Sequence, residues 1–484
     1  MLALSPYAQE ILHDSLAWMA PLYDPAARLL WHPGDPDYRG EPRPPSHMVR
    51  DSTYYALGLL MRAAPGDAAR AEDVLNAILD YQLDEPGAVY HGTFLRSPEE
   101  PRPGPGAREW RDYDPNWRDF IGTGFALILI HFEPLLSRPL IERIHRALRL
   151  AVEGTLARQV RPGYTNIALM DAYLLHFSGA RLGVPAWMQA GEVLAQQVYD
   201  LFQENGAFEE YNSPTYYGTD LYALRLWNTF CNYPSGSELL ARLGHAMETR
   251  LWEDIARYYH AGLGNVAGPY DRSYGMDMRR YAALLGLWIW LAVGRRLAPF
   301  PDTTRPFGHC ADLCFGPCAA ITGVNIPAGA LPHFLAFQGP RLVQQPISSS
   351  PRRVASAWID AHFMMGGEWT SRAKPGYGQF HPFTLHWQTL TGQTGWARLR
   401  HENPVDVQIE PKTAGIAGSG ALVFEVYAPG VQVTDLRPRA WQLNGVSVSV
   451  ENGPATFQAR QVEEDYFEIH YAQEGEFAFR LYVS

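Results

Sequence analysis

The stretch APFPDTTRPFG, residues 298–308, separates two parts of the sequence that differ in hydrophobic periodicity. Before it, apolar residues recur every three or four positions, as in LIERIHRALRLAVEGTLARQV at 140–160, which is the spacing of an amphipathic helix. After it, short runs alternate apolar and polar residues, as in EFAFRLYV at 476–483, which is the spacing of a half-buried strand. The sequence therefore predicts an α+β protein with a helical domain over 1–300 and an antiparallel sheet domain over 301–484.

The helical domain combines amphipathic segments with segments that are apolar on nearly every side. FIGTGFALILIHF at 120–132 and YAALLGLWIWLAVG at 281–294 are of the second kind and should be buried on most faces. We expect an incomplete (α/α) toroid, in which such helices form an inner layer around a cleft and ligands bind in that cleft or next to the sheet domain. The predicted helices are 5–20, 52–63, 68–83, 118–134, 138–158, 165–179, 185–203, 216–231, 236–260 and 277–297, with long loops at 31–46 and 96–117.

The sheet domain is predicted to be an antiparallel β-sandwich, because turn residues interrupt the alternating runs about every ten residues. The predicted strands lie within 332–338, 353–367, 383–390, 421–428, 446–453, 456–462, 466–473 and 476–483.

Composition excludes several classes of function. Of the 484 residues, 46% are hydrophobic and 19% charged, as in ordinary globular proteins. The net charge of −11 argues against a nucleic acid or an anionic membrane as partner. The sequence contains no run of about 18 apolar residues, which is the length that a membrane-spanning helix needs. The first twenty residues lack the features of a signal peptide, so a cytoplasmic protein is expected. The sequence leaves the oligomeric state open.

The cysteines do not predict a metal site. Three of the four lie in HCADLCFGPC at 309–318, spaced by four residues, which differs from the usual zinc-binding spacing. We expect buried thiols there, and neither a metal nor another cofactor.

One segment concentrates polar and aromatic residues just before a helix. NGAFEEYNSPTYYGTDLYALRLW, residues 205–227, opens with an Asn-Gly turn signal. Ser213 is placed to cap the helix, with Pro214 at its first position. Tyr216 would then lie in the first turn, at the mouth of the helical ring.

Two further segments carry polar residues at helix entrances. RPGYTNIALMDAYLLHF at 161–177 has Asn166 near the start of an otherwise apolar helix. HAGLGNVAGPYDRSYGMDMRRY at 260–281 has a glycine-rich loop with Asp271 and Arg272. A loop that offers an arginine fork at a helix entrance suits recognition of a carboxylate.

NGAFEEYNSPTY at 205–216 resembles the segment that carries the catalytic tyrosine in heparinase II/III-like and alginate-lyase-like polysaccharide lyases. That segment has a glycine turn, a Glu and a Ser-Pro or Gly-Pro shortly before a Tyr. Those enzymes have an α/α toroid followed by an antiparallel β-sandwich, and an Asn on a helix some fifty residues upstream; here Asn166 precedes Tyr216 by 50 residues. The family often has a polar residue after this Asn, whereas this chain has Ile167. The resemblance implies cleavage of an oligo- or polysaccharide beside a uronic acid by β-elimination.

The resemblance also implies roles for individual residues. Asn166 would neutralise the C6 carboxylate, helped by Arg272 or Arg118, so that the C5 proton becomes acidic. Tyr216 would be the acid, or both acid and base, with a nearby cation to lower its ordinary pKa of about 10. The expected catalytic residues are Tyr216, Asn166, His260 and Arg272, with His47 and His91 as alternative bases. The expected substrate-binding residues are Glu210, Tyr211, Asn212, Tyr217, Tyr270, Asp271, Tyr274, Trp117, Arg118 and His381, the last from HFMMGGEWTSRAKPGYGQFHP (362–382), which resembles a strand-turn-strand of these lyases facing the toroid.

An inverting glycoside hydrolase is the first alternative. Such an enzyme needs two carboxyl groups about 6.5–9.5 Å apart on either side of a water. Glu209 or Glu210 would have to pair with Asp271 or Asp277 across the cleft.

The second alternative is a carbohydrate-binding protein without catalysis. Trp31, Trp110 and Trp117 would then be platforms on which sugar rings stack.

Overall fold

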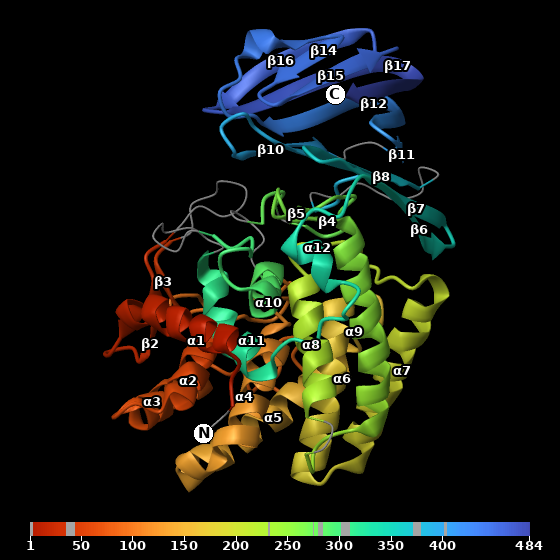
Figure 1. The fold of residues 1–484 in the computed structure, drawn as a ribbon. Coiled ribbons are helices and arrows are strands. Elements are labelled where there is room, and N and C mark those ends of the chain that lie inside the picture. The colour runs from red at the N-terminus through yellow and green to blue at the C-terminus, as the bar shows by residue number, and fades with distance from the viewer. Residues whose placement is uncertain are drawn as a thin grey trace.

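The predicted fold class is confirmed. The computed structural model describes residues 3–34, 44–230, 233–273, 275–278, 284–301, 310–370, 379–400 and 404–484. Helices occupy the first part of the chain and an antiparallel sheet the last, and the sheet covers one end of the helical part (Figure 1). Among the described residues, no helix is both long enough and apolar enough to span a membrane.

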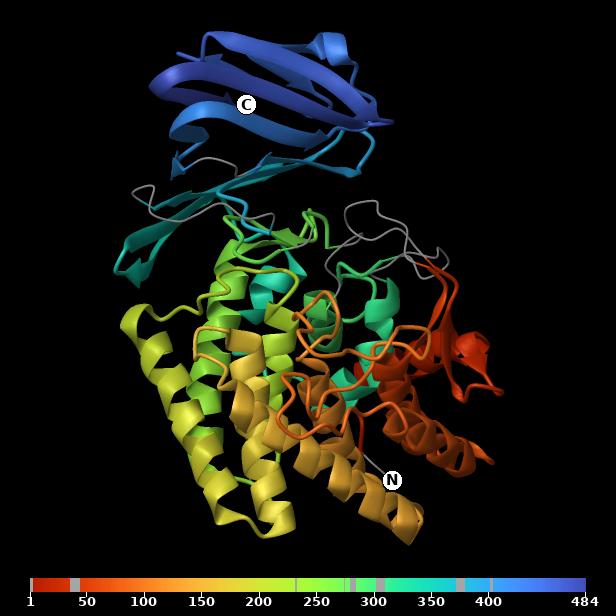
Figure 2. The ribbon, with the colours of Figure 1, turned by 180° about the vertical axis from the view of Figure 1, so that it is seen from behind.

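The helices form two layers. In the inner layer α2 packs on α4, α4 on α6, α6 on α8 and α8 on α10, while α3, α5, α7 and α9 each pack outside one inner helix (Figures 1 and 2). α1 packs against α2, α10 and α11. The bounds are α1 Pro6–Met19, α2 Val49–Arg62, α3 Asp67–Leu79, α4 Trp117–Phe132, α5 Arg138–Arg158, α6 Thr165–Leu182, α7 Pro185–Asn205, α8 Tyr217–Thr229, α9 Glu238–Tyr258, α10 Leu284–Val293, α11 Gly316–Thr322 and α12 Leu331–Leu335.

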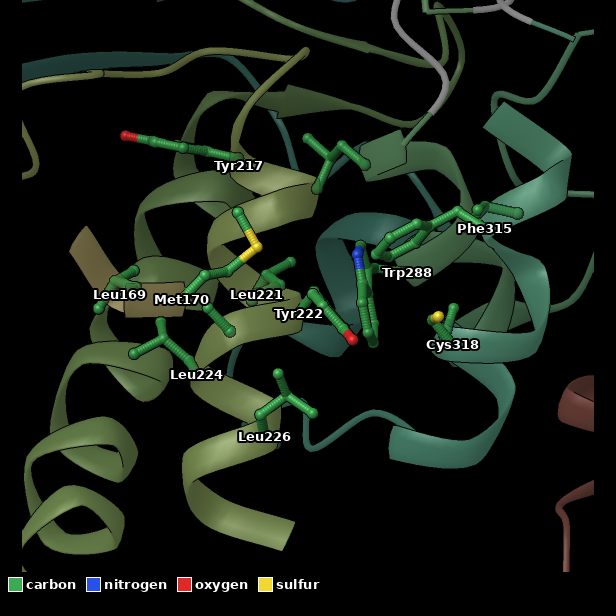
Figure 3. Close-up of a cluster of buried hydrophobic side chains, with 14 of the residues drawn as sticks. Leu169, Met170, Tyr217, Leu221, Tyr222, Leu224, Leu226, Trp288, Phe315 and Cys318 are labelled. Atoms are coloured by element: carbon green, nitrogen blue, oxygen red, sulfur yellow. The ribbon is translucent and has the colours of Figure 1, made fainter. Parts of the chain in front are cut away.

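Sequence pattern explains the two layers. Every residue of α6 from Thr165 to Gly179 is buried, whereas α7 buries only one stripe of small and apolar residues, the pattern of an outer amphipathic helix. Figure 3 shows the packing between α6, α8, α10 and α11. There the Trp288 indole donates a hydrogen bond to the Gly218 carbonyl at 2.6 Å, and Tyr222 packs edge-on against Phe315.

Two of the cysteines lie in this same interior. Cys314 and Cys318 are buried free thiols, and Cys318 packs in the cluster of Figure 3. Cys231 and His309 lie outside the described residues, as does the side chain of Cys310.

The sheet domain folds one continuous antiparallel sheet into two layers around its own core. Two long strands, β12 and β17, pair along most of their length and connect the layers. A bulge at Ser419/Gly420 bends β12. The bounds are β6 Arg341–Ser349, β7 Arg352–Ile359, β8 Phe363–Trp369, β9 Phe383–Gln388, β10 Thr394–Arg400, β11 Val405–Glu410, β12 Thr413–Tyr427, β13 Leu436–Arg437, β14 Ala440–Leu443, β15 Val446–Glu451, β16 Thr456–Glu463 and β17 Tyr466–Val483.

Some local predictions were wrong. The run 332–338 was expected to be a strand, but Leu331–Leu335 is helix α12, because Pro332 starts it and Phe334 points its ring into the core against Trp252 and Tyr259. The predicted loop 31–46 includes parts of a three-stranded sheet, β1 Tyr23–Asp24, β2 Leu29–His32 and β3 Ser46–Met48.

The sheet domain is joined to a loop of the helical domain. This loop follows the short hairpin β4 Tyr259–His260 and β5 Asn265–Val266. Tyr270 pairs with His381 as an antiparallel bridge, and the Ser273 N–H donates to the Gln379 carbonyl at 2.8 Å. Gly366 of β8 packs so closely on Gly268 that a Cβ atom at Gly366 would overlap the Gly268 backbone. The sheet therefore holds the backbone on both sides of Arg272.

Candidate active site

The N-terminal ends of three inner helices meet at one place. Asn116, Tyr164 and Tyr216 are the residues immediately before α4, α6 and α8. The Asn116 amide Nδ2 donates to the Tyr164 phenol oxygen at 3.0 Å, which joins the first two ends. Because the N-terminal end of a helix carries a partial positive charge, this place favours an anionic ligand.

Glu210 is the centre of the polar cluster and is completely buried. Nδ2 of Asn166 donates to its two carboxylate oxygens at 2.9 and 2.8 Å, and the Asn166 backbone N–H donates to Oε2 at 3.2 Å. Nη1 of Arg272 donates to Oε1 at 2.6 Å. Burial raises the pKa of Glu210, while Arg272 and Asn166 act in the opposite direction. Asn166, Glu210 and Arg272, which lie far apart in the sequence, thus form one hydrogen-bonded unit.

Arg272 connects this buried unit to the solvent. Its guanidinium carbon lies 4.3 Å from the centre of the Tyr164 ring and 5.0 Å from that of Tyr216, within the range of cation–π contacts. Its side chain is 24% exposed. Burial lowers the pKa of Arg272, but Glu210 and the two tyrosines outweigh burial and the pKa is raised. The site therefore presents a permanent cation in contact with two phenol rings.

The Arg272 backbone is held in an unusual conformation, with φ of 59°. The Ser213 hydroxyl donates to the Arg272 carbonyl at 3.0 Å and accepts from the Tyr216 backbone N–H at 3.0 Å. Ser213 thus makes the expected cap-like bond, although helix α8 begins later, at Tyr217. One serine fixes the relative position of Arg272 and Tyr216.

His381 supports the same loop from the sheet domain. Its Nε2 lies 2.9 Å from the Ser273 carbonyl oxygen. Burial and the nearby Arg398 lower the pKa of His381 well below its ordinary value, so its ring is neutral and its Nε2–H donates to that carbonyl. In this structure His381 contacts the loop that carries Arg272.

Tyr164 is a site residue that the sequence reasoning did not select. It lies within the quoted segment 161–177, but an aromatic residue at a helix entrance has no local signal that distinguishes it from a core residue. Asn116, which donates to the Tyr164 phenol, is itself held by Arg158, the last residue of α5: Nη1 of Arg158 donates to Oδ1 of Asn116 at 2.8 Å. Burial raises the pKa of Tyr164, and Arg272 and Asn116 oppose this effect.

Asp220 is a further carboxyl group near the site, and unlike Glu210 it was not selected from the sequence. It lies in the first turn of α8 and is completely buried. Among the described residues, neither of its oxygens has a hydrogen-bond partner. Burial raises the pKa of Asp220 well above its usual value, with a further increase from Glu210 and an opposing effect of Arg272. We therefore treat Asp220 as a neutral carboxylic acid.

Five of the expected substrate-binding residues are buried in the segments around Arg272, four of them in loops and Tyr217 at the start of α8. Asn212 donates its backbone N–H to the Tyr217 phenol oxygen at 2.6 Å and its side-chain amide to the Pro269 carbonyl at 3.3 Å. The Tyr211 carbonyl accepts from the Asp271 N–H at 2.9 Å, and the Tyr270 hydroxyl donates to the Val266 carbonyl. The five are Tyr211, Asn212, Tyr217, Tyr270 and Asp271. Tyr274 lies outside the described residues.

Trp117 and Arg118 begin helix α4 but differ in their surroundings. Trp117 is half-buried, with the Arg50 guanidinium 5.3 Å from the centre of its ring. Arg118 is buried against α5, where Gly154 leaves room for its guanidinium, and burial lowers its pKa. Arg118 thus contacts the interior of the helical layers.

The candidate histidine bases have other contacts. Nε2 of His260 lies 3.0 Å from the Asp360 carbonyl oxygen, Nδ1 accepts from the Leu263 N–H at 3.1 Å, and burial lowers its pKa. His47 lies between the carboxylates of Asp24 and Glu99. His91 lies 3.3 Å from Glu153. The described contacts of these histidines do not include Arg272, Tyr216 or Asn166.

Three of the four carboxylates named for a hydrolase are held in ion pairs or hydrogen bonds within the protein. Glu209 forms an ion pair with Arg161 at 2.6 Å near the surface. Asp271 is buried and lies 3.3 Å from Arg353, which also binds Glu368. Glu210 has both oxygens hydrogen-bonded. In the part of the chain that the structure describes, no group of three or more metal-ligating side chains could hold a metal ion.

Residues 9–324 match the family described as "Domain of unknown function (DUF8769)". A search of curated protein sequences finds no match. Among solved structures, a heparan sulfate lyase HepC mutant from Pedobacter heparinus is 11% identical, with 90% of this chain and 76% of that chain covered and a TM-score of 0.37. The heparinase III BT4657 gene product is 9% identical, with 89% and 76% covered and a TM-score of 0.35. These similarities are too distant to transfer an activity.

Proposed function

The chain belongs to the DUF8769 family, and from its site we propose that it is a carbon–oxygen lyase that cleaves a uronic-acid-containing oligo- or polysaccharide by β-elimination. The observation that carries this proposal is the position of Arg272. Its guanidinium contacts the rings of both Tyr164 and Tyr216, and its side chain is 24% exposed. Elimination next to a carboxylate requires a cation close to proton-transferring groups.

In the proposed reaction Arg272 binds the C6 carboxylate of the uronic acid and stabilises the negative charge that develops when C5 loses its proton. Tyr216 is the phenol that takes part in proton transfer. The electrons of the C5–H bond form the C4=C5 double bond, and the C4–O bond breaks.

Asn166 has a different place in this proposal from the one first expected. Its amide donates to Glu210, a carboxylate of the protein itself. We assign the neutralisation of the substrate carboxylate to Arg272, and assign to Asn166 and Glu210 the positioning of Arg272.

The test is a panel of uronic-acid polymers and oligosaccharides incubated with wild type and with Tyr216→Phe. Elimination produces an unsaturated uronate, which absorbs ultraviolet light, whereas hydrolysis produces only new reducing ends. We expect absorbance to rise with wild type and to be lost in Tyr216→Phe. Tyr7→Phe, an exposed tyrosine of α1, is the matched control and should behave as wild type.

Reducing ends without absorbance would contradict elimination and favour the hydrolase. Binding that persists without any turnover in wild type would favour the carbohydrate-binding protein.

A further inference from the structure

We infer that Tyr164 is a second catalytic phenol of this site, the group that gives its proton to the leaving glycosidic oxygen. This inference rests on the proposed elimination and adds a residue to it.

The first argument is position. Tyr164 is half-buried at the entrance of α6, and its ring lies closer to the Arg272 guanidinium than the Tyr216 ring does, 4.3 Å against 5.0 Å. A carboxylate bound to Arg272 would therefore lie near both phenols. Two separate groups are then available, one for the C5 proton and one for the leaving oxygen.

The second argument is the direction of the hydrogen bond between Asn116 and Tyr164. Because Oδ1 of Asn116 accepts from the cationic Arg158 at 2.8 Å, the other end of the amide, Nδ2, must face Tyr164. The Tyr164 oxygen is therefore the acceptor of this bond. Its own hydrogen is not used in it and remains for another acceptor.

The third argument is charge. When Tyr164 gives up its proton, the phenolate that forms is stabilised by the Asn116 donor and by Arg272. Before transfer, burial favours the neutral phenol by raising the pKa of Tyr164, which suits an acid rather than a base. Tyr216 is left as the base.

The protons and electrons balance in this scheme. The Tyr216 phenolate takes the C5 proton, the C5–H electrons form the C4=C5 bond, and the C4–O electrons go to the leaving oxygen. That oxygen takes the Tyr164 proton. The proton on Tyr216 and the charge on Tyr164 are then exchanged through solvent, which restores the starting state.

The experiment separates an acid from a base and from a structural residue. Wild type, Tyr164→Phe and Tyr216→Phe are compared on a uronide oligosaccharide that wild type cleaves. In D₂O, deuterium at C5 of recovered substrate reports removal of the C5 proton. A second uronide carries 4-nitrophenoxide at C4, a leaving group that needs no protonation.

We expect Tyr164→Phe to lose about 100-fold or more in kcat on the oligosaccharide, the usual contribution of a general acid. The same variant should keep C5 exchange and recover most of its rate on the nitrophenyl substrate. Tyr216→Phe should lose exchange and should not recover.

Unchanged turnover of Tyr164→Phe on the oligosaccharide would overturn the inference. The inference would also be overturned if Tyr164→Phe unfolds at the wild-type temperature but loses both C5 exchange and nitrophenyl cleavage. Tyr164 would then be a base or a support for Arg272. If Tyr164→Phe does not fold, Asn116→Ala replaces it, with the same rescue by nitrophenoxide expected. If wild type eliminates none of the uronides, the proposed function itself fails, which is a different result from an active wild type with an unaffected Tyr164→Phe.

Discussion

Replacing Glu210 by Gln should release Arg272 from its position. Glu210 accepts from the Asn166 amide, the Asn166 backbone and Arg272 through two oxygens. Gln has only one acceptor oxygen, so at least one of these donors would face an NH₂ group. Arg272 would also lose its buried counter-charge.

The magnitude follows from the burial of the two partners. Removing one partner of a buried ion pair costs about 3–5 kcal/mol. Glu210 is fully buried, but the Arg272 side chain is 24% exposed and regains some hydration, so we expect the lower end, about 3 kcal/mol. Misplacing Arg272 by about 1 Å should also lower kcat/KM for elimination about 100-fold.

The assay is chemical unfolding together with elimination kinetics, and the neighbouring residue supplies the control. Glu209→Gln removes the same charge one position earlier, where the ion pair with Arg161 is exposed and should contribute less than about 1 kcal/mol. If Glu210→Gln and Glu209→Gln have the same unfolding free energy and both retain wild-type kcat/KM, the assignment of Glu210 as the group that positions Arg272 is refuted.

Three other predictions concern the surroundings of Arg272. Since burial raises the pKa of Asp220, the folded protein keeps a proton that the unfolded chain loses above about pH 4, so this group's stabilising effect declines as pH rises. Asp220→Asn should therefore gain thermal stability relative to wild type as the pH rises above about 4, and a constant difference would contradict this. Ser213→Ala and Ser237→Ala, the latter removing the N-cap of α9, should each cost about 1–2 kcal/mol on unfolding, but only Ser213→Ala should lower kcat. His381→Gln should lower kcat without moving the pH–rate profile between about pH 5 and 8, because the buried ring does not titrate there; a shifted profile would contradict its neutral state.

Hydrophobic periodicity in the sequence predicted most of the fold. Apolar residues recur every three or four positions in a helix and every second position in a strand. This pattern depends only on near neighbours in the chain, so it separated the helical part from the sheet part and predicted most elements. It failed at 332–338, where Pro332 and the burial of Phe334 against Trp252 and Tyr259 favour a helix over the alternating pattern.

The sequence predicted only some of the residues that form the site. Turn and helix-start signals, together with the family resemblance, pointed to Asn166, Glu210, Ser213, Tyr216 and Arg272. Tertiary packing alone decided that Asn166 donates to Glu210 and not to solvent.

Packing also decided which neighbours in the chain are neighbours in space. His260 is near Arg272 in the sequence, yet its ring bonds to the Asp360 carbonyl. Tyr164 is far from Arg272 in the sequence, yet their side chains touch, because the helices α6 and α8 begin at the same end of the inner layer and the sheet domain holds the Arg272 loop against that end. The hydrophobic pattern of a segment can be read from that segment's sequence alone. The partner of a buried polar group depends instead on how distant segments pack together.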